Sequence, residues 1–326
     1  MNDLWPVTLN DLEIAAQVIE QTLPTTTATI SWPLLSERCG CEVWVKHENH
    51  LPTEAFKVRG GLVYMDWLTS TYPEVSGVIA ATRGNHGQSV AFAATAKSLS
   101  STVVVPHGNS VGKNRAMRAY GAELIEHGED FADALDYAGK LSKEQDLHFV
   151  PSFDWKLVHG VGTIGLELFR SVNDLDVIYL PIGLGSGICG MIAARKALGM
   201  EEKTELVGVV AELANAYAKS FAAGHVVETD SANTMADGVS CRIPDPRAVE
   251  VINTHVSRIV EVSEEEIQNA MRHYFTDAHQ VAEGAGAIPL AALLKEKDQI
   301  GGKRIGLVLS GGNVDAPVYA EILKTS

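Results

Sequence analysis

The sequence is short of positive charge. It contains 26 Lys and Arg residues against 41 Asp and Glu residues, which gives a formal net charge of −15. Phosphate backbones and anionic lipids are negative themselves, so they repel a chain this acidic. We therefore expect no nucleic-acid partner and no membrane partner, and we favour a small-molecule substrate.

Cysteine is scarce as well. In a chain of this size, four cysteines are more typical of free thiols than of a disulfide framework. Cys39 and Cys41 lie near His47 and His50, which leaves a structural zinc site as an alternative. One intervening residue is, however, shorter than the usual spacing of zinc-binding cysteines. The four cysteines are Cys39, Cys41, Cys189 and Cys241.

The sequence has little that resembles a targeting or membrane segment. Residues Met1–Leu4 lack the basic and apolar parts of a signal peptide, so we expect a cytoplasmic protein. The stretch Val177–Ala194 has 18 residues without a charge, at the lower edge of membrane-span length. Because it contains Pro181 and four glycines, we interpret it as a strand, a loop and the start of a helix.

What is abundant is an alternation of short apolar runs with longer helical patterns. With 326 residues and 46% hydrophobic residues, this alternation predicts an α/β fold with a mainly parallel sheet. The predicted strands are Glu42–Lys46, Gly77–Ala81, Ser101–Pro106, Glu123–Glu126, His148–Pro151, Val177–Pro181, Glu205–Ala211 and Arg304–Leu309. The predicted helices are Gln88–Ser98, Gly112–Tyr120, Asp130–Gln145, Gly162–Val172 and Glu264–Ala278.

The middle of the chain has the pattern of a small inserted domain. Residues Gly77 to Phe153 form a compact alternation of strands and helices. We expect a small domain at 77–153, inserted into a large domain made of 1–76 and 154–326. No long linker is present, so the two domains should share a close interface.

The first candidate site is a glycine-rich turn that follows the predicted strand Val177–Pro181. Glycines let the backbone approach an anion, and the N–H groups of a following helix point towards it. The turn therefore favours a phosphate site, while a tight strand–helix turn without a ligand is the alternative. This turn, here called the glycine loop, consists of Gly183, Leu184, Gly185, Ser186 and Gly187.

The same region also matches a dinucleotide-binding pattern. Gly185, Gly187 and Gly190 fit G-x-G-x-x-G, and Glu212 ends the next predicted strand, where an acid would bind a ribose. This leaves a nicotinamide-dependent oxidoreductase open. Nothing in the sequence marks a hydride-transfer site.

The second candidate is Lys57, in the opening turn of a probable helix just past the loop at Pro52. A helix N-terminus and the cation of Arg59 would both lower the pKa of the amine, which suits Schiff-base chemistry. The alternative is an ordinary solvated lysine.

The third candidate is a polar turn between the predicted strand Gly77–Ala81 and the helix Gln88–Ser98. Polar side chains and free N–H groups at the carboxyl end of a strand can bind a carboxylate, although a simple helix cap is the alternative. This polar turn consists of Thr82, Arg83, Gly84, Asn85 and His86. A fourth turn, with Ser310 and Asn313, follows the predicted strand Arg304–Leu309.

In this order, the four pieces resemble the fold-type II pyridoxal-phosphate enzymes, specifically the group of serine/threonine dehydratases (ammonia-lyases) and serine racemases. The resemblance runs from Trp32 to Asn313 and includes the segments Arg115–Glu123 and Thr234–Gly238. It implies a fold like that of the tryptophan synthase β-subunit, with two open, twisted, mainly parallel sheet domains. It also implies a homodimer.

The resemblance implies roles for individual residues. Lys57 would bind pyridoxal 5'-phosphate as a Schiff base and later remove the Cα proton, with Phe56 packed beside the ring. The glycine loop would hold the cofactor phosphate. Asn85 would face the ring hydroxyl and Ser310 the ring nitrogen. The polar turn would bind the substrate carboxylate.

The implied reaction is the conversion of a β-hydroxy amino acid such as threonine or serine to a 2-oxo acid and ammonia. Arg83 stands where serine racemases carry a proton-transferring serine, and a guanidinium does not deprotonate in proteins. We therefore favour dehydration over racemisation. Paired with a second carboxylate, Arg83 would favour 3-hydroxyaspartate, but an outward-facing side chain is the preferred interpretation. Phenylserine as substrate and a non-catalytic amino-acid-binding protein also stay open.

The racemase-like members of the group bind a divalent metal through a Glu, a backbone carbonyl and an Asp. In this sequence Glu212 and Ala216 match the first two positions, whereas Ala218 replaces the Asp. Losing a carboxylate weakens a site for a hard cation. We therefore expect weak or absent dependence on magnesium or calcium.

Overall fold

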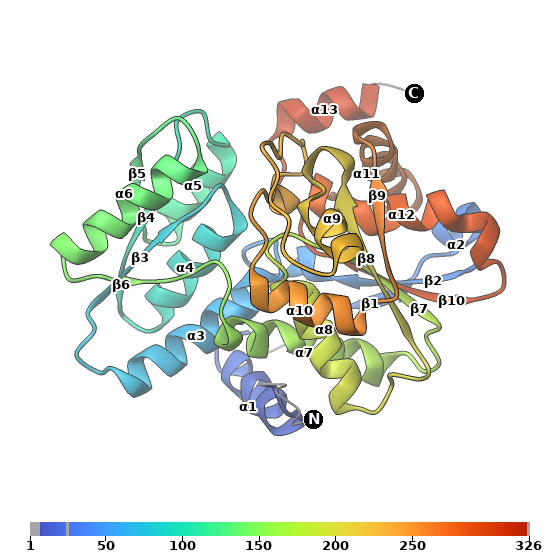
Figure 1. Cartoon of the computed structure of the whole chain (residues 1–326), viewed down its shortest axis with the longest axis horizontal. Helices are drawn as coiled ribbons and strands as arrows, with labels where there is room; N and C mark the ends of the chain where they lie inside the picture. The colour runs from blue at the N-terminus through green and yellow to red at the C-terminus, as the bar shows by residue number, and fades with distance from the viewer. Residues whose placement is uncertain (1–6, 24–25, 325–326) are drawn as a thin grey trace.

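The computed structural model describes residues 7–23 and 26–324, in which ten strands form two separate sheets (Figure 1). The six-stranded sheet has the order β1-β2-β10-β7-β8-β9, and the four-stranded sheet has the order β5-β4-β3-β6. The first sheet comprises β1 (Thr29–Ser31), β2 (Glu42–His47), β7 (Val177–Pro181), β8 (Glu205–Ala211), β9 (Arg258–Val262) and β10 (Arg304–Leu309). The second comprises β3 (Gly77–Ala81), β4 (Ser100–Val105), β5 (Glu123–Glu126) and β6 (His148–Phe149).

Helices cover both faces of the six-stranded sheet. Its strands are parallel except for β1, which pairs with β2 in the antiparallel sense. Strands β7 and β8 are apolar and almost entirely buried, as expected for a parallel sheet enclosed between two helical layers. One core joins this sheet to α11 (Glu264–Ala278) and α12 (Gly284–Ile300), and the opposite core joins it to α7 (Trp155–Ser171) and α8 (Ser186–Ala197).

The four-stranded sheet is entirely parallel and carries its own helices. These are α4 (Asn85–Ala96), α5 (Val111–Ala119) and α6 (Phe131–Glu144). Helix α3 (Lys57–Thr71) packs on both α4 and α7, and so connects the two parts of the molecule. All four strands of this sheet lie between Gly77 and Phe149. We therefore propose that the sheets mark two domains, a small one at 77–153 and a large one at 1–76 and 154–326.

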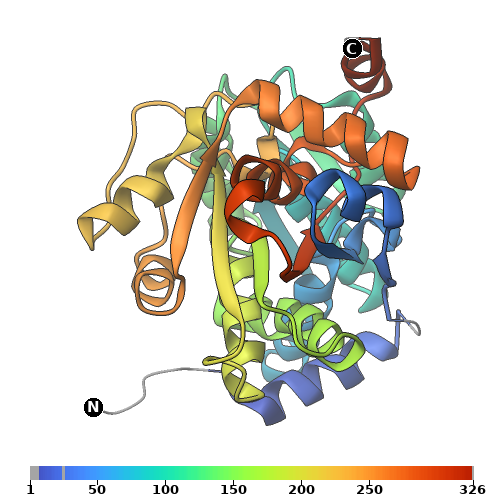
Figure 2. The same cartoon turned by 90° about the vertical axis from the view of Figure 1, so that its right-hand side faces the viewer.

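Five further helices complete the described part of the chain. Helix α1 and helix α13 lie at opposite ends of the molecule, as two perpendicular views show (Figures 1 and 2). The five are α1 (Leu9–Glu20), α2 (Pro33–Cys39), α9 (Ala216–Ala223), α10 (Pro246–His255) and α13 (Ala316–Lys324). Within the described residues, no helix has the length and apolar character that a membrane crossing requires. The expectation drawn from Met1–Leu4 lies outside those residues.

The predicted strands are confirmed, with small changes at their ends. The strand predicted at His148–Pro151 is shorter, because only His148–Phe149 pairs with β3. Two strands had not been predicted. Strand β1 has only three residues, and β9 lies at the sheet edge, where its charged residues obscure the apolar pattern. The interpretation of Val177–Ala194 as strand, loop and helix is confirmed, because the segment forms β7 and the first part of α8.

The helix predicted at Gly162–Val172 begins earlier, at Trp155, where the side chain of Asp154 caps it. Glycine is a poor helix former, which hid the first turns from a pattern-based prediction. In the structure these glycines allow close packing. A methyl group at Gly160 would lie 2.3 Å from the carbonyl oxygen of Arg59, so α7 and α3 can approach this closely only because Gly160 has no side chain.

Candidate active site

Lys57 is the first residue of α3 and follows Phe56 directly. Its Nζ lies 4.6 Å from the centroid of the Phe56 ring. Burial lowers the pKa of Lys57 to about 8, although the carboxylate of Glu283 partly opposes this shift. At pH 7 about a tenth of the amine is therefore uncharged and able to act as a nucleophile or a base, far more than for an ordinary lysine.

The predicted influence of Arg59 on Lys57 is wrong. The guanidinium of Arg59 is buried in an ion cluster, where its Nε lies 2.7 Å from Glu48 and its Nη1 lies 2.6 Å from Glu167. Residues two apart on a helix do not face each other. Loss of water around Lys57 lowers its pKa, while Arg59 anchors the first turn of α3 to α7.

The glycine loop joins the end of β7 to the start of α8 at Ser186. Gly185 precedes the helix with φ 97°, a left-handed conformation that favours glycine. A methyl group at Gly187 would lie 3.6 Å from the Phe56 ring, so the loop borders the segment that carries Lys57. The first N–H groups of α8 have no partner within the helix and can bind an anion here.

The polar turn lies between β3 and α4. The hydroxyl of Thr82 accepts hydrogen bonds from the N–H groups of Gly84 (3.0 Å) and Gly87 (3.3 Å), so it fixes the shape of the turn. His86 is buried, and its Nε2 has no hydrogen-bond partner in the described structure. Burial, together with the nearby charge of Lys57, lowers the pKa of His86 to about 4. His86 is therefore neutral at physiological pH.

Arg83 differs from the other residues of the polar turn. Thr82, Gly84, Asn85 and His86 are all buried, whereas Arg83 is exposed. Within the part of the chain that the structure describes, no hydrogen bond or ion pair is found for its guanidinium. It is therefore a cation next to the turn without an internal partner.

Asn85 is held by the carboxylate of Glu283, a residue that was not predicted from the sequence. The Nδ2 of Asn85 donates to Oε1 of Glu283 over 2.5 Å, and its Oδ1 accepts from Nδ2 of Asn313 over 3.0 Å. Glu283 immediately precedes α12 and is 3% exposed. Both ends of the Asn85 amide are therefore oriented, with its Nδ2 kept as a donor.

Lys113 of α5 completes this network. Its Nζ donates to Oε2 of Glu283 (3.2 Å) and to Oδ2 of Asp237 (2.6 Å). Burial opposes the charge on Lys113, but the two carboxylates outweigh it and raise the pKa of Lys113. Burial raises the pKa of Glu283, and Lys113 opposes that change. The turn at Gly84 makes room for Lys113, because a methyl group at Gly84 would lie 2.8 Å from its Cδ.

The turn after β10 meets the segment of Lys57. The carbonyl of Ser310 accepts from the N–H of Phe56 over 3.0 Å, and Ala55 forms an isolated bridge with Gly311. Ser310 is 4% exposed. The structure thus brings the predicted pieces together at the carboxyl ends of β3, β7 and β10, the usual position of ligand sites in open α/β sheets.

A second contact between the two sheets lies beside this region. Asp315, which follows the Ser310 turn, accepts hydrogen bonds from the hydroxyl of Ser110 and the N–H of Gly112, both at 3.0 Å. These two residues stand at the N-terminus of α5. Helix α5 is therefore joined to the other sheet through both Lys113 and its own first turn.

At the possible metal positions, the one carboxylate is already paired with a lysine. The carboxylate of Glu212 lies 3.6 Å from the ammonium of Lys295, and Ala218 supplies no oxygen ligand from its side chain. Among residues 7–23 and 26–324, no group of three His, Cys, Asp or Glu side chains is placed to hold a metal. Cys39 and Cys41 are buried free thiols, and burial raises the pKa of Cys39 to about 12. The zinc alternative is therefore not supported.

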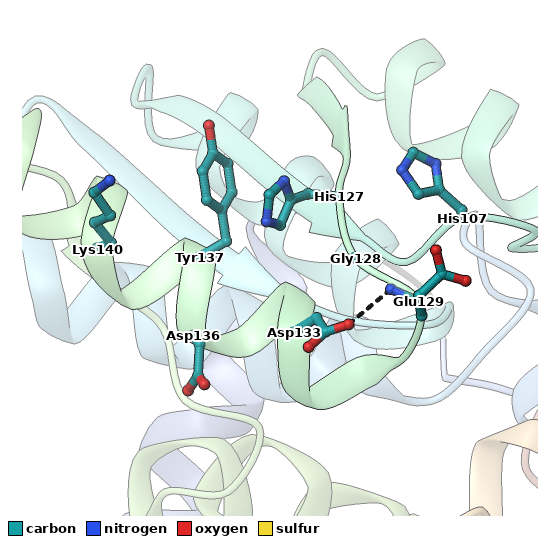
Figure 3. A pocket seen from close by; sticks show the side chains of 8 residues that line it. All are labelled: His107, His127, Gly128, Glu129, Asp133, Asp136, Tyr137 and Lys140. Atoms are coloured by element: carbon teal, nitrogen blue, oxygen red, sulfur yellow. Dashed lines mark hydrogen bonds between the residues drawn. The ribbon is translucent and has the colours of Figure 1, made fainter.

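A separate surface pocket lies at the end of the small sheet, away from all of these residues (Figure 3). In it, the ring of His127 stacks on Tyr137 with 3.8 Å between the centroids. The N–H of Glu129 donates to Asp133 over 2.8 Å, as the dashed line in Figure 3 marks. None of the predicted site residues lines this pocket. Its lining residues are His107, His127, Gly128, Glu129, Asp133, Asp136, Tyr137 and Lys140.

A protein-family model described as pyridoxal-phosphate dependent enzyme matches residues 21–311. The chain belongs to this family. It is 34% identical over 318 residues to the L-threonine ammonia-lyase of Thermotoga maritima, covering 97% of this chain and 78% of that protein. These findings confirm the predicted family and the α/β fold, and they favour pyridoxal phosphate over a nicotinamide cofactor.

Solved structures of the pyridoxal-phosphate family agree with this assignment. The crystal structure of a pyridoxal 5'-phosphate-dependent aspartate racemase superposes with a TM-score of 0.90 at 26% identity, covering 96% of this chain and 98% of that one. The crystal structure of a threonine deaminase from T.th. superposes with a TM-score of 0.86 at 32% identity, covering 94% of this chain and 99% of that one.

The residues of this pyridoxal-phosphate enzyme fit its cofactor. Lys57 offers an amine with a pKa of about 8. An amine with this pKa can attack the carbonyl group of the cofactor near neutral pH. The glycine loop offers a helix N-terminus, and it packs so closely on α10 that a methyl group at Gly185 would lie 2.6 Å from Cβ of Ala248. The Phe56 ring lies between these two features.

Proposed function

We propose that the chain is a dehydratase (ammonia-lyase) that converts a β-hydroxy amino acid of the threonine or serine type to a 2-oxo acid and ammonia. The observation that carries this proposal is the buried amine of Lys57, held between the glycine loop and the polar turn. The name of the Thermotoga maritima relative supports the reaction type.

The cofactor would be held by groups from both ends of the chain. The N–H groups of Gly183, Leu184, Gly185, Ser186 and Gly187 would bind its phosphate, and Phe56 would pack beside its ring. Asn85 would donate to the ring hydroxyl, and Ser310 would face the ring nitrogen. When bound, pyridoxal phosphate draws electron density from the substrate Cα, which makes the Cα proton removable.

The substrate carboxylate would bind at the polar turn, where Thr82 shapes the backbone and α4 begins. Arg83 through its backbone, together with Gly84, Asn85 and His86, would complete this binding site. Nζ of Lys57 would then take the Cα proton, and its pKa of about 8 suits a base that works near neutral pH. The electron pair left at Cα would then expel the β-hydroxyl, which leaves as water once it has taken up a proton.

Dehydration is favoured over racemisation because neither Arg83 nor His86 in the polar turn is suited to be a second proton-transferring group. The guanidinium of Arg83 stays protonated. The pKa of His86, lowered to about 4, leaves that imidazole too weak a base to remove a Cα proton. Serine racemase activity is therefore the weaker alternative.

A second candidate substrate follows from the exposed guanidinium of Arg83. An amino acid with a second carboxylate, such as 3-hydroxyaspartate, would give this cation a partner. Phenylserine and a non-catalytic amino-acid-binding role lack a specific supporting contact. A cytoplasmic location and a homodimer are further parts of the proposal, and the homodimer rests on the resemblance.

The test is borohydride reduction of one sample of the purified protein followed by peptide mass spectrometry, with a 2-oxo acid assay on a second, unreduced sample. We expect the cofactor on the peptide that contains Lys57, and 2-oxo acid from threonine or serine. Lys57→Ala should abolish both, whereas Lys97→Ala, which removes a lysine paired with Asp66, should change neither. A reduced protein with the cofactor on another lysine would refute the assignment.

A further inference from the structure

Tyr217 is a buried residue that contacts the glycine loop from outside. It lies in the first turn of α9 and is 1% exposed. Its hydroxyl donates a hydrogen bond to the carbonyl of Leu184 (2.9 Å) and accepts one from the N–H of Asp245 (3.2 Å). Asp245 caps the N-terminus of α10. One phenol therefore links the glycine loop to two helices.

The hydroxyl of Tyr217 is a permanent donor. Burial raises the pKa of Tyr217 well above its usual value, and the neighbouring Cys241 adds to the shift. The phenol therefore keeps its proton over the whole range in which the protein is folded and active. That proton is committed to Leu184, so the geometry gives Tyr217 no part in proton transfer to a substrate.

The bond to Leu184 fixes the orientation of one peptide group. All peptide bonds among the described residues are trans, so the carbonyl of Leu184 and the N–H of Gly185 point in opposite directions. Because the carbonyl points to Tyr217, the N–H of Gly185 points away from α9. Gly185 has φ 97°. Because glycine can adopt several backbone conformations, a contact with a neighbouring residue is needed to fix this one.

A second contact restricts the same position. A methyl group at Gly185 would lie 3.2 Å from the hydroxyl of Tyr217 and 2.6 Å from Cβ of Ala248. The loop is therefore enclosed on the side of α9 and α10, and only its other side can receive a ligand. The N–H of Gly185 points to that other side.

We propose that Tyr217 is a positioning residue for the cofactor phosphate. Its hydrogen bond orients the carbonyl of Leu184 towards α9. The N–H of Gly185 therefore points to the phosphate, as the first N–H groups of α8 do. The inference rests on the proposed function, in which the glycine loop binds that phosphate.

The test compares Tyr217→Phe with Tyr179→Phe in the holoenzyme. Tyr179 is a matched control, because its buried hydroxyl also makes one donor bond, to Glu296 over 2.6 Å, on the opposite face of the large sheet. The measurements are the dissociation constant of pyridoxal phosphate, the phosphorus NMR shift of the bound phosphate, and KM for threonine at saturating cofactor. Melting temperatures of both apoproteins show whether each variant is folded.

In Tyr217→Phe we expect the cofactor to bind about five- to tenfold more weakly, the size of effect that one lost hydrogen bond produces. The phosphorus shift should move, while KM at saturating cofactor stays the same. Tyr179→Phe should match the wild type in all three. Equal cofactor affinity and phosphorus shift in both variants and the wild type would overturn the inference. Equal weakening in both variants would also overturn it, since the effect would then be general destabilisation. A wild-type protein that binds no pyridoxal phosphate would instead refute the proposed function itself.

Discussion

The ammonium of Lys113 lies 3.2 Å from the buried carboxylate of Glu283, and this ion pair joins the four-stranded sheet to the six-stranded one. Glu283 in turn accepts the hydrogen bond that orients Asn85. The charge of Lys113 therefore supports Asn85, a residue of the proposed cofactor site, through a carboxylate that comes from the other side of the molecule.

Replacing this cation should be costly. In Lys113→Met, Glu283 would remain buried without its cation, and removal of one partner from a buried pair typically costs about 3 kcal/mol or more. We expect a decrease of about that size in the free energy of unfolding, measured by urea denaturation, together with weaker cofactor binding. Lys140→Met removes a lysine from the exposed pair with Glu144 and should change neither. Unaltered stability in Lys113→Met would contradict the inferred role of this pair.

The lowered pKa of Lys57 predicts how the apoprotein should react with pyridoxal phosphate. The folded pKa of about 8 lies below the ordinary 10.5. Half of the amine is therefore deprotonated at about pH 8, and deprotonation is nearly complete about one pH unit higher. The rate of cofactor attachment, followed by absorbance, should rise with pH and then level off. A rate that still climbs above about pH 10 would indicate an ordinary solvated lysine.

Glu283 offers a check on the sign of this shift. Its negative charge raises the pKa of Lys57 and so opposes the effect of burial. In Glu283→Gln the pKa of Lys57 should therefore fall further, and the levelling-off should move to lower pH. A shift to higher pH would show that the two groups do not interact in this way.

Arg83 predicts both a stereochemical and a substrate preference. The wild-type enzyme should release 2-oxo acid from one enantiomer of serine without interconverting the two, because a guanidinium does not exchange protons. If the second carboxylate of 3-hydroxyaspartate pairs with Arg83, Arg83→Ala should lose about tenfold or more in kcat/KM for that substrate. Its kcat/KM for serine should stay nearly constant. Equal losses for both substrates would argue that Arg83 only stabilises the turn.

The pairing of Glu212 with Lys295 predicts independence of divalent cations. The ammonium already lies 3.6 Å from this carboxylate, and Ala218 provides no second one. Activity and melting temperature should be the same before and after chelation and on addition of magnesium. The double variant Lys295→Ala with Ala218→Asp restores two free carboxylates and should gain a magnesium response. A wild-type protein that is stabilised by magnesium would contradict the prediction.

Much of the fold was predictable because the parallel strands are buried on both faces and read as continuous apolar runs. Val177–Pro181 and Glu205–Ala211 are examples whose bounds agree with the structure. The edge strand Arg258–Val262 was missed, since half-buried charged residues interrupt its apolar pattern. The first turns of α7 were missed because glycine has a low helix propensity. In the structure, the glycines of α7 allow close packing against α3.

The site was predictable where a turn carries its own local signal. The glycine loop and the polar turn each follow an apolar strand, so their positions at the carboxyl ends of strands could be expected. Glu283 and Lys113 carry no such signal, since they are 170 residues apart in the sequence and only folding brings them together. Arg59 shows the opposite case, because proximity in sequence suggested a contact with Lys57 that helix geometry does not allow.

The N-terminus of helix α5 is capped in part by Asp315, which belongs to the other side of the molecule. Any motion that separates the two sheets must break both of these hydrogen bonds and release the N–H of Gly112 from Asp315. Hydrogen–deuterium exchange at Gly112 would thus report how often the two halves part, without a probe attached to the protein.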